Sequence, residues 1–90
     1  MKMKISKEKK DKISEQILGI LFTSFPDSFF TAQISREIAR DEEFTKSLLK
    51  ELWHKNLVVA IKKNPKGVTF SKRIKWRISN KAYSAYKQHQ

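Results

Sequence analysis

The second half of this chain carries charge of only one sign. Residues 52–90 contain ten basic side chains and no acidic one, whereas residues 13–51 have a net charge of −3. Surface charge of a single sign repels itself and weakens a fold unless a partner neutralises it. The chemistry expected of this half is the binding of a polyanion, and nucleic acid is the commonest polyanion. The ten residues are Lys55, Lys62, Lys63, Lys66, Lys72, Arg73, Lys75, Arg77, Lys81 and Lys87.

Catalytic chemistry finds little support. No nucleophile and base, and no pair of carboxylates, show a recognisable spacing, and two glycines cannot form a phosphate-cradling loop. His54 and His89 are isolated, and the absence of cysteine excludes thiolate metal sites. The carboxylates of residues 41–43 diverge around the start of a helix. The sequence predicts a protein that is not an enzyme and has no cofactor or metal.

The length and composition predict one small soluble domain. Ninety residues, 39% of them apolar, suffice for a single domain over residues 1–90, in which the basic segment 1–6 is free to be flexible. The longest apolar run, residues 17–22, is far shorter than the roughly 20 residues that span a bilayer. The basic start continues into more lysine and not into an apolar stretch, so no signal peptide is visible. We expect a cytoplasmic protein that does not contact membranes.

Caps and prolines divide the first half into two helices. Ser6 can cap a first helix whose apolar residues recur at steps of three and four, and Pro26 ends it near Phe25. After the β-prone pair 29–30, Thr31 is expected to cap a short second helix. The residues expected to face inward are Ile13, Ile17, Ile20, Leu21, Phe25, Ile34, Ile38 and Ala39.

The second half predicts a helix, a hairpin and a last helix. Asp41 caps a helix over 42–55, and Asn56 can adopt the left-handed conformation that ends it. Residues 57–61 are β-branched and apolar, and residues 68–78 alternate between an apolar and a basic face. Ser79 caps the last short helix. The buried stripe expected on helix 42–55 is Thr45, Leu48, Leu49 and Leu52.

Two helices joined by a tight turn at Arg40-Asp41 and followed by a basic hairpin resemble the winged helix-turn-helix domains of MarR/ArsR-like transcriptional regulators. The resemblance covers residues 29–87 and lies in pattern more than in identity. Leu52 precedes Asn56-Leu57-Val58 where that family has Gly-Leu-Val. Residues 76–82 correspond to its pattern of an aromatic, a variable residue and Leu-Thr, with Ile78-Ser79 in the place of Leu-Thr. The resemblance implies a mostly helical α+β fold with a three-helix core, a two-stranded basic wing and a short C-terminal helix.

The resemblance also implies that helix 42–55 enters the major groove of double-stranded DNA while wing 62–75 follows the backbone. The residues of that helix outside the buried stripe are Glu43, Lys46, Ser47, Lys50 and His54. Lysine and serine suit base edges or phosphates, and Glu43 could accept from a cytosine amino group. The wing residues expected on phosphates or in the minor groove are Lys62, Lys63, Lys66, Lys72 and Arg73, and Thr31 and Gln33 open the second helix where one phosphate could bind. The function implied is a small sequence-specific DNA-binding transcriptional regulator.

Several alternatives stay open. The same fold serves RNA-binding proteins of the small basic ribosomal type and protein-interaction modules in transcription or replication assemblies. Core packing is favoured over base stacking for Trp53 and Trp76. A homodimer could form through Tyr83 and Tyr86 or through the N-terminal segment, because helix-turn-helix proteins gain specificity by pairing half-sites. The last helix could equally fold back against the first.

Overall fold

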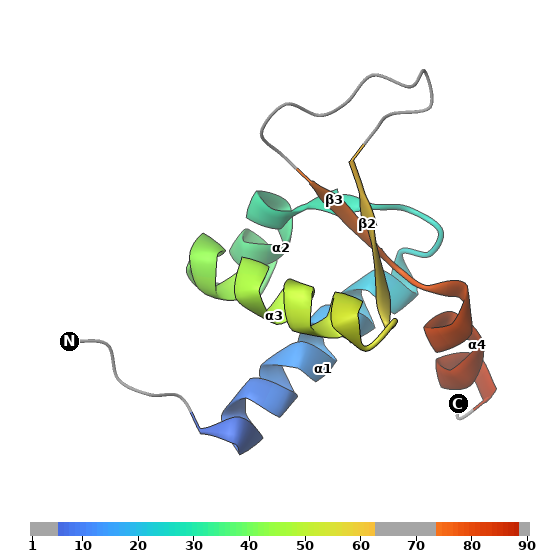
Figure 1. Cartoon of the computed structure of the whole chain (residues 1–90), viewed down its shortest axis with the longest axis horizontal. Helices are drawn as coiled ribbons and strands as arrows, with labels where there is room; N and C mark the ends of the chain where they lie inside the picture. The colour runs from blue at the N-terminus through green and yellow to red at the C-terminus, as the bar shows by residue number, and fades with distance from the viewer. Residues whose placement is uncertain (1–5, 63–73, 89–90) are drawn as a thin grey trace.

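The computed structural model describes residues 6–62 and 74–88 (Figure 1). Four helices and three strands follow one another in the predicted order of helix, short strand, two helices, hairpin and helix. The elements are α1 (Lys7–Thr23), β1 (Phe29–Phe30), α2 (Thr31–Glu37), α3 (Glu42–His54), β2 (Val58–Ile61), β3 (Lys75–Ile78) and α4 (Asn80–Gln88).

Helix α1 begins where its cap was predicted. The Ser6 hydroxyl accepts the Lys9 N–H at 3.2 Å, which satisfies one of the unpaired donors of the first turn. The predicted Ile13, Ile17 and Leu21 are buried, Ile20 is half-buried, and Leu18, which was not predicted, is 3% exposed. The helix ends at Thr23, two residues before the predicted end at Phe25.

Helix α2 starts differently from the prediction. Thr31 is not its cap, because Phe30 holds the extended N-cap position and its N–H donates to Oε1 of Gln33 at 2.8 Å. A glutamine at the third helical position can reach back to the chain in this way, so no capping hydroxyl is needed. Ile34 and Ile38 face inward as predicted, but Ala39 is exposed, with a φ of 54° at the turn toward α3.

Helix α3 agrees with its prediction in most details. The Asp41 carboxylate accepts the Phe44 N–H at 3.1 Å. The predicted stripe Thr45, Leu48, Leu49 and Leu52 is buried. The helix ends at His54, one residue before the predicted end, and Asn56 has a φ of 62°, the left-handed conformation expected of it.

The strands form one antiparallel sheet in the order β1-β3-β2. Val58 pairs with Ile78 and Ala60 with Trp76 across the hairpin, while Phe29 pairs with Trp76 on the other edge. Because side chains alternate along a strand, Trp76 and Ile78 share the core face, and Lys75 and Arg77 share the opposite face. This confirms the predicted alternation for these four residues. Residues 68–73 of the predicted alternation lie outside the described residues.

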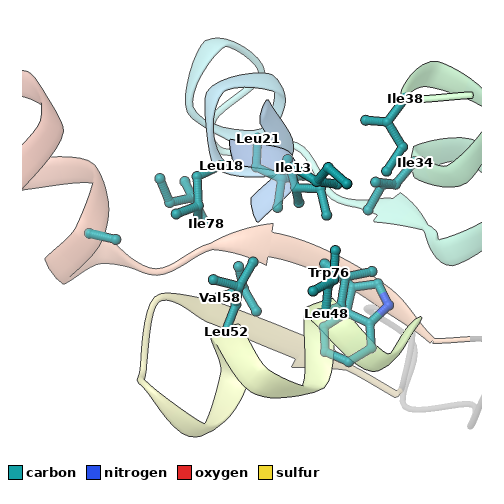
Figure 2. Close-up of a cluster of buried hydrophobic side chains, with 13 residues drawn as sticks. Ile13, Leu18, Leu21, Ile34, Ile38, Leu48, Leu52, Val58, Trp76 and Ile78 are labelled. Carbon is teal, nitrogen blue, oxygen red and sulfur yellow. The ribbon is translucent and has the colours of Figure 1, made fainter. Parts of the chain in front are cut away.

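The core lies between this sheet and helices α1, α2 and α3, with Ala82 added from α4. Figure 2 shows the labelled side chains converging on Trp76 and Ile78 of β3. Trp76 is 1% exposed, as predicted, and its indole N–H donates to the Thr31 hydroxyl at 2.8 Å. A buried N–H is costly without an acceptor, so this bond explains why an indole is accepted at the centre.

Ser79 joins the end of α3 to the start of α4. Its hydroxyl donates to the Asn56 carbonyl at 2.9 Å and accepts the Ala82 N–H at 3.0 Å. Its backbone N–H donates to the Leu57 carbonyl at 3.0 Å. The predicted cap of the last helix is confirmed. The same residue also satisfies the backbone around the left-handed Asn56.

Candidate nucleic-acid interface

One side of helix α3 packs against the core, and the other side is exposed to solvent. Burial of its four-residue stripe leaves the opposite face in solvent. All five residues predicted to face outward on this helix are exposed. They are Glu43, Lys46, Ser47, Lys50 and His54.

Charge is unevenly distributed along α3. The first turn carries Glu42 and Glu43, which are favourable beside the positive end of the helix dipole, and Asp41 is occupied as the cap. The last two turns carry Lys50 and His54 on the exposed face, while the exposed Glu51 pairs with Lys10 of α1, with 3.2 Å between Nζ and Oε2. The side chains of α3 that can attract an anion in these turns are therefore Lys50 and His54.

Ser47 is exposed but already has a hydrogen bond. Its hydroxyl donates to the Phe44 carbonyl at 2.7 Å, one turn back. A hydroxyl that donates within the helix still has acceptor capacity. Ser47 can therefore accept from a base amino group without breaking this bond.

Two side chains at the start of α2 were predicted to contact a phosphate, and one of them is buried in the core. Thr31 is 8% exposed, and its hydroxyl accepts the Trp76 indole N–H, so this side chain belongs to the core. Gln33 is exposed, and its Oε1 accepts the Phe30 N–H. The sequence could not reveal this arrangement, because the donor to Thr31 lies 45 residues later in the chain.

The wing is described only in part. Lys62 is exposed at the end of β2. Lys63, Lys66, Lys72 and Arg73 lie outside the described residues.

Along β3, where Lys75 pairs with Ile61 next to Lys62, the basic side chains contact the fold. Lys75 Nζ lies 5.0 Å from the centre of the Phe30 ring, in the range of a cation–π contact. Arg77 Nη1 donates to the Ile78 carbonyl at 2.9 Å and to Oδ1 of Asn80 at 3.4 Å. Both side chains therefore take part in intramolecular contacts.

Trp53 was predicted to lie in the core, and this was wrong. Its side chain is 44% exposed, and its ring centre lies 5.2 Å from that of His54. Position 53 follows position 46 by seven residues, almost two helical turns, so it falls on the side that displays Lys46. Position 53 also follows the buried Leu49 by four residues, so spacing alone places it at the edge of the buried stripe, and the general preference of tryptophan for protein interiors decided the prediction.

Helix α4 packs back against α1. The ring of Tyr83 stacks on Phe25 with centres 3.9 Å apart and lies 5.1 Å from Phe22. The Tyr86 hydroxyl donates to a Glu15 carboxylate oxygen at 3.0 Å. Burial, the hydrogen bond to Glu15 and the charge of Glu15 together raise the pKa of Tyr86 to about 12. Of the two arrangements considered for this helix, the fold-back on α1 is present within the chain.

Among residues 6–62 and 74–88, no helix is long and apolar enough to cross a membrane. In the same ranges, no three potential metal-ligating side chains come together. His89 lies outside them.

No protein-family model and no curated protein sequence matches this chain. Solved structures do. MepR of S. aureus in its DNA-binding conformation has a TM-score of 0.69 at 16% identity, over 84% of this chain and 53% of that one. The zinc-responsive MarR family member ZitR of Lactococcus lactis has a TM-score of 0.66 at 19% identity, over 99% of this chain and 54% of that one.

A third structure, the S. aureus MepR–DNA complex, has a TM-score of 0.69 at 19% identity, over 90% of this chain and 66% of that one. The chain thus spans between about half and two thirds of the length of these structures. Of these structures, ZitR is a MarR family member and MepR has been solved with DNA. The chain has the mostly helical, MarR-type winged-helix fold.

Proposed function

We propose that this chain is a sequence-specific DNA-binding module of a transcription regulator, with α3 in the major groove. The observation that carries the proposal is the exposed face of α3, on which Lys46, Ser47 and Lys50 stand opposite a fully buried stripe. The fold adds support, because MepR, which shares it, has been solved as a complex with DNA.

The dimensions and side chains of α3 suit a groove. Its 13 residues make a rod about 20 Å long, and the major groove of B-DNA, about 12 Å wide, admits one α-helix. Lys46 and Lys50 can donate to guanine acceptors, and Ser47 can serve either a donor or an acceptor. Glu43 can accept from a cytosine amino group, which would make the acidic turn a source of sequence preference.

The wing completes the proposed interface. Lys62 is the described member of the basic set at residues 62–73. In the proposal Lys62, Lys63, Lys66 and Lys72 lie along phosphates, and Arg73 enters a narrow minor groove, because guanidinium loses its water more easily than ammonium does. Gln33, in the first turn of α2, and His54, the last residue of α3, supply further contacts to the DNA backbone. The side chain of Thr31 has no part in the interface.

A competition experiment tests the proposal. Labelled duplexes enriched from a random library by the intact chain should be displaced by unlabelled copies of themselves at lower concentration than by scrambled duplex. Structured RNA and single strands should compete no better than scrambled duplex. Preferential displacement by structured RNA would replace DNA with RNA as the ligand. Failure to enrich any duplex would refute the proposal.

We also propose that two copies act together on a pseudo-palindromic site. A single winged helix reads about one half-site, and helix-turn-helix proteins gain specificity by pairing two half-sites a helical turn apart. Light scattering of the protein, free and bound to the enriched duplex, measures the oligomeric state directly. One protomer per duplex at every concentration would remove this part of the proposal without affecting DNA binding.

A further inference from the structure

We infer that Trp53 is a base-contacting residue whose indole packs against the methyl group of a thymine in the major groove. The inference rests on the proposed function, since it assigns one contact within the same interface. Trp53 is the large hydrophobic side chain left exposed among residues 6–62 and 74–88, at 44% of its surface.

A single exposed hydrophobic residue needs no special explanation. The inference therefore depends on where Trp53 lies on α3. Trp53 follows Lys50 by three residues and Lys46 by seven, spacings that put the three side chains on one side of a helix. Along the axis, Trp53 lies about 4.5 Å beyond Lys50 and about 10 Å beyond Lys46. Both lysines are exposed. The indole therefore continues the row of side chains proposed to read the groove.

The charge around Trp53 selects an anionic partner. Lys50 and His54 are exposed beside it, and the acid-free part of the chain begins at Leu52. The acidic first turn of α3 is about 15 Å away along the helix axis. A second copy of this chain would bring a net charge of +11 to the same place, which opposes pairing of two such faces. Duplex DNA offers the opposite charge.

The major groove also offers something for an indole to contact. Each thymine presents its C5-methyl group there, the one apolar group by which a protein recognises a base directly. An indole buries a large flat surface against such a group, and its N–H can donate to a nearby phosphate. The His54 ring, tilted 47° from the indole and 5.2 Å away, is placed beside it toward the end of the helix.

The experiment removes the methyl group from the DNA and the indole from the protein. Each thymine of the enriched duplex is replaced in turn by deoxyuridine, which differs only by that methyl group. We expect the intact protein to lose about fourfold in affinity at one position, as for withdrawing one methyl-sized group from contact. Trp53→Ala should bind the thymine duplex on the order of tenfold more weakly. The same variant should then bind the thymine and deoxyuridine duplexes equally.

Two controls and a second measurement isolate the contact. Gln16→Ala removes an exposed side chain of α1, remote in sequence from α3, and should leave both affinities unchanged. Trp53→Phe retains an aromatic surface and should keep part of the thymine preference. Tryptophan fluorescence of the intact protein should change when the enriched duplex is added. Trp53→Phe, which leaves only the buried Trp76, should show no such change.

The outcomes separate this inference from the proposed function. The thymine contact is refuted if Trp53→Ala loses affinity equally for all duplexes, or if this variant still binds the deoxyuridine duplex more weakly by the same factor as the intact protein. Either result leaves the proposed DNA binding unaffected. If the intact protein enriches no duplex, both are refuted. Circular dichroism of Trp53→Ala confirms that it is folded. The fluorescence and deoxyuridine measurements on the intact protein need no variant.

Discussion

The indole N–H of Trp76 donates to the hydroxyl of Thr31 at 2.8 Å, in the buried space where β3 meets the first residue of α2. Among the described residues no buried side-chain nitrogen or oxygen lacks a hydrogen-bond partner, so the polar atoms of this core are satisfied. The bond links two segments 45 residues apart. It also positions α2, on which α3 packs.

Removing the acceptor should destabilise the fold without altering the DNA-facing surface. Thr31→Val keeps the shape of the side chain but leaves the buried indole N–H unpaired, at a cost of about 1–3 kcal/mol. Urea unfolding followed by circular dichroism measures the change. Thr23→Val is the matched control, because the Thr23 hydroxyl donates to the Gly19 carbonyl at an exposed site. The affinity of folded Thr31→Val for duplex DNA should equal that of the intact protein. A large loss of affinity would show that Thr31 takes part in the interface.

Stability should fall at high pH through Tyr86. Its pKa is raised from 10.0 to about 12, so the folded state favours the neutral phenol. The stabilisation is fully present below pH 10 and is lost as pH rises through 12, where the phenolate forms beside the Glu15 carboxylate. The free energy of unfolding of the intact protein, minus that of Tyr86→Phe, should decrease across this window. Tyr86→Phe removes only the phenol hydroxyl, so a difference that stays constant would contradict the assignment.

Affinity for duplex DNA should depend steeply on salt. If about six basic side chains engage phosphates in each protomer, the logarithm of the binding constant should fall with the logarithm of salt concentration at a slope near −5. This slope corresponds to a loss of roughly a thousandfold between about 50 and 200 mM salt. Fluorescence anisotropy on a labelled duplex measures it. A slope shallower than about −2 would argue against a basic phosphate-binding surface.

Contacts to bases and to phosphates should separate by mutation. Lys50→Ala should weaken the free energy of binding to the enriched duplex by roughly 1–3 kcal/mol, and that to random DNA by less, because Lys50 is proposed to reach base edges. Replacing Lys63, Lys66 and Arg73 together with alanine should weaken binding to all duplexes by similar factors, since phosphate contacts carry no sequence information. Lys12→Ala, at an exposed position on α1, is a matched control for the loss of one charge. Equal losses on both duplexes from Lys50→Ala would remove α3 from sequence recognition.

Local chemistry in the sequence determined most of the elements. Ser6, Asp41 and Ser79 cap their helices because a side-chain oxygen next to the chain can accept an unpaired N–H, whatever the rest of the protein does. The spacing of Thr45, Leu48, Leu49 and Leu52 likewise fixed the buried face of α3, and with it the outward positions of Lys46 and Lys50. These features depend on neighbours within about four residues.

Only the tertiary structure decided the roles of Thr31, Trp53 and Tyr86. Thr31 could cap a helix or bind a phosphate until β3 brought Trp76 against it, and the partner of Tyr86 within the chain, Glu15 of α1, depended on how α4 packs. Trp53 lies at the edge of the buried stripe of α3, and its side chain is 44% exposed. Long-range partners of this kind follow from how the elements pack together, so the spacing of residues along the chain does not reveal them.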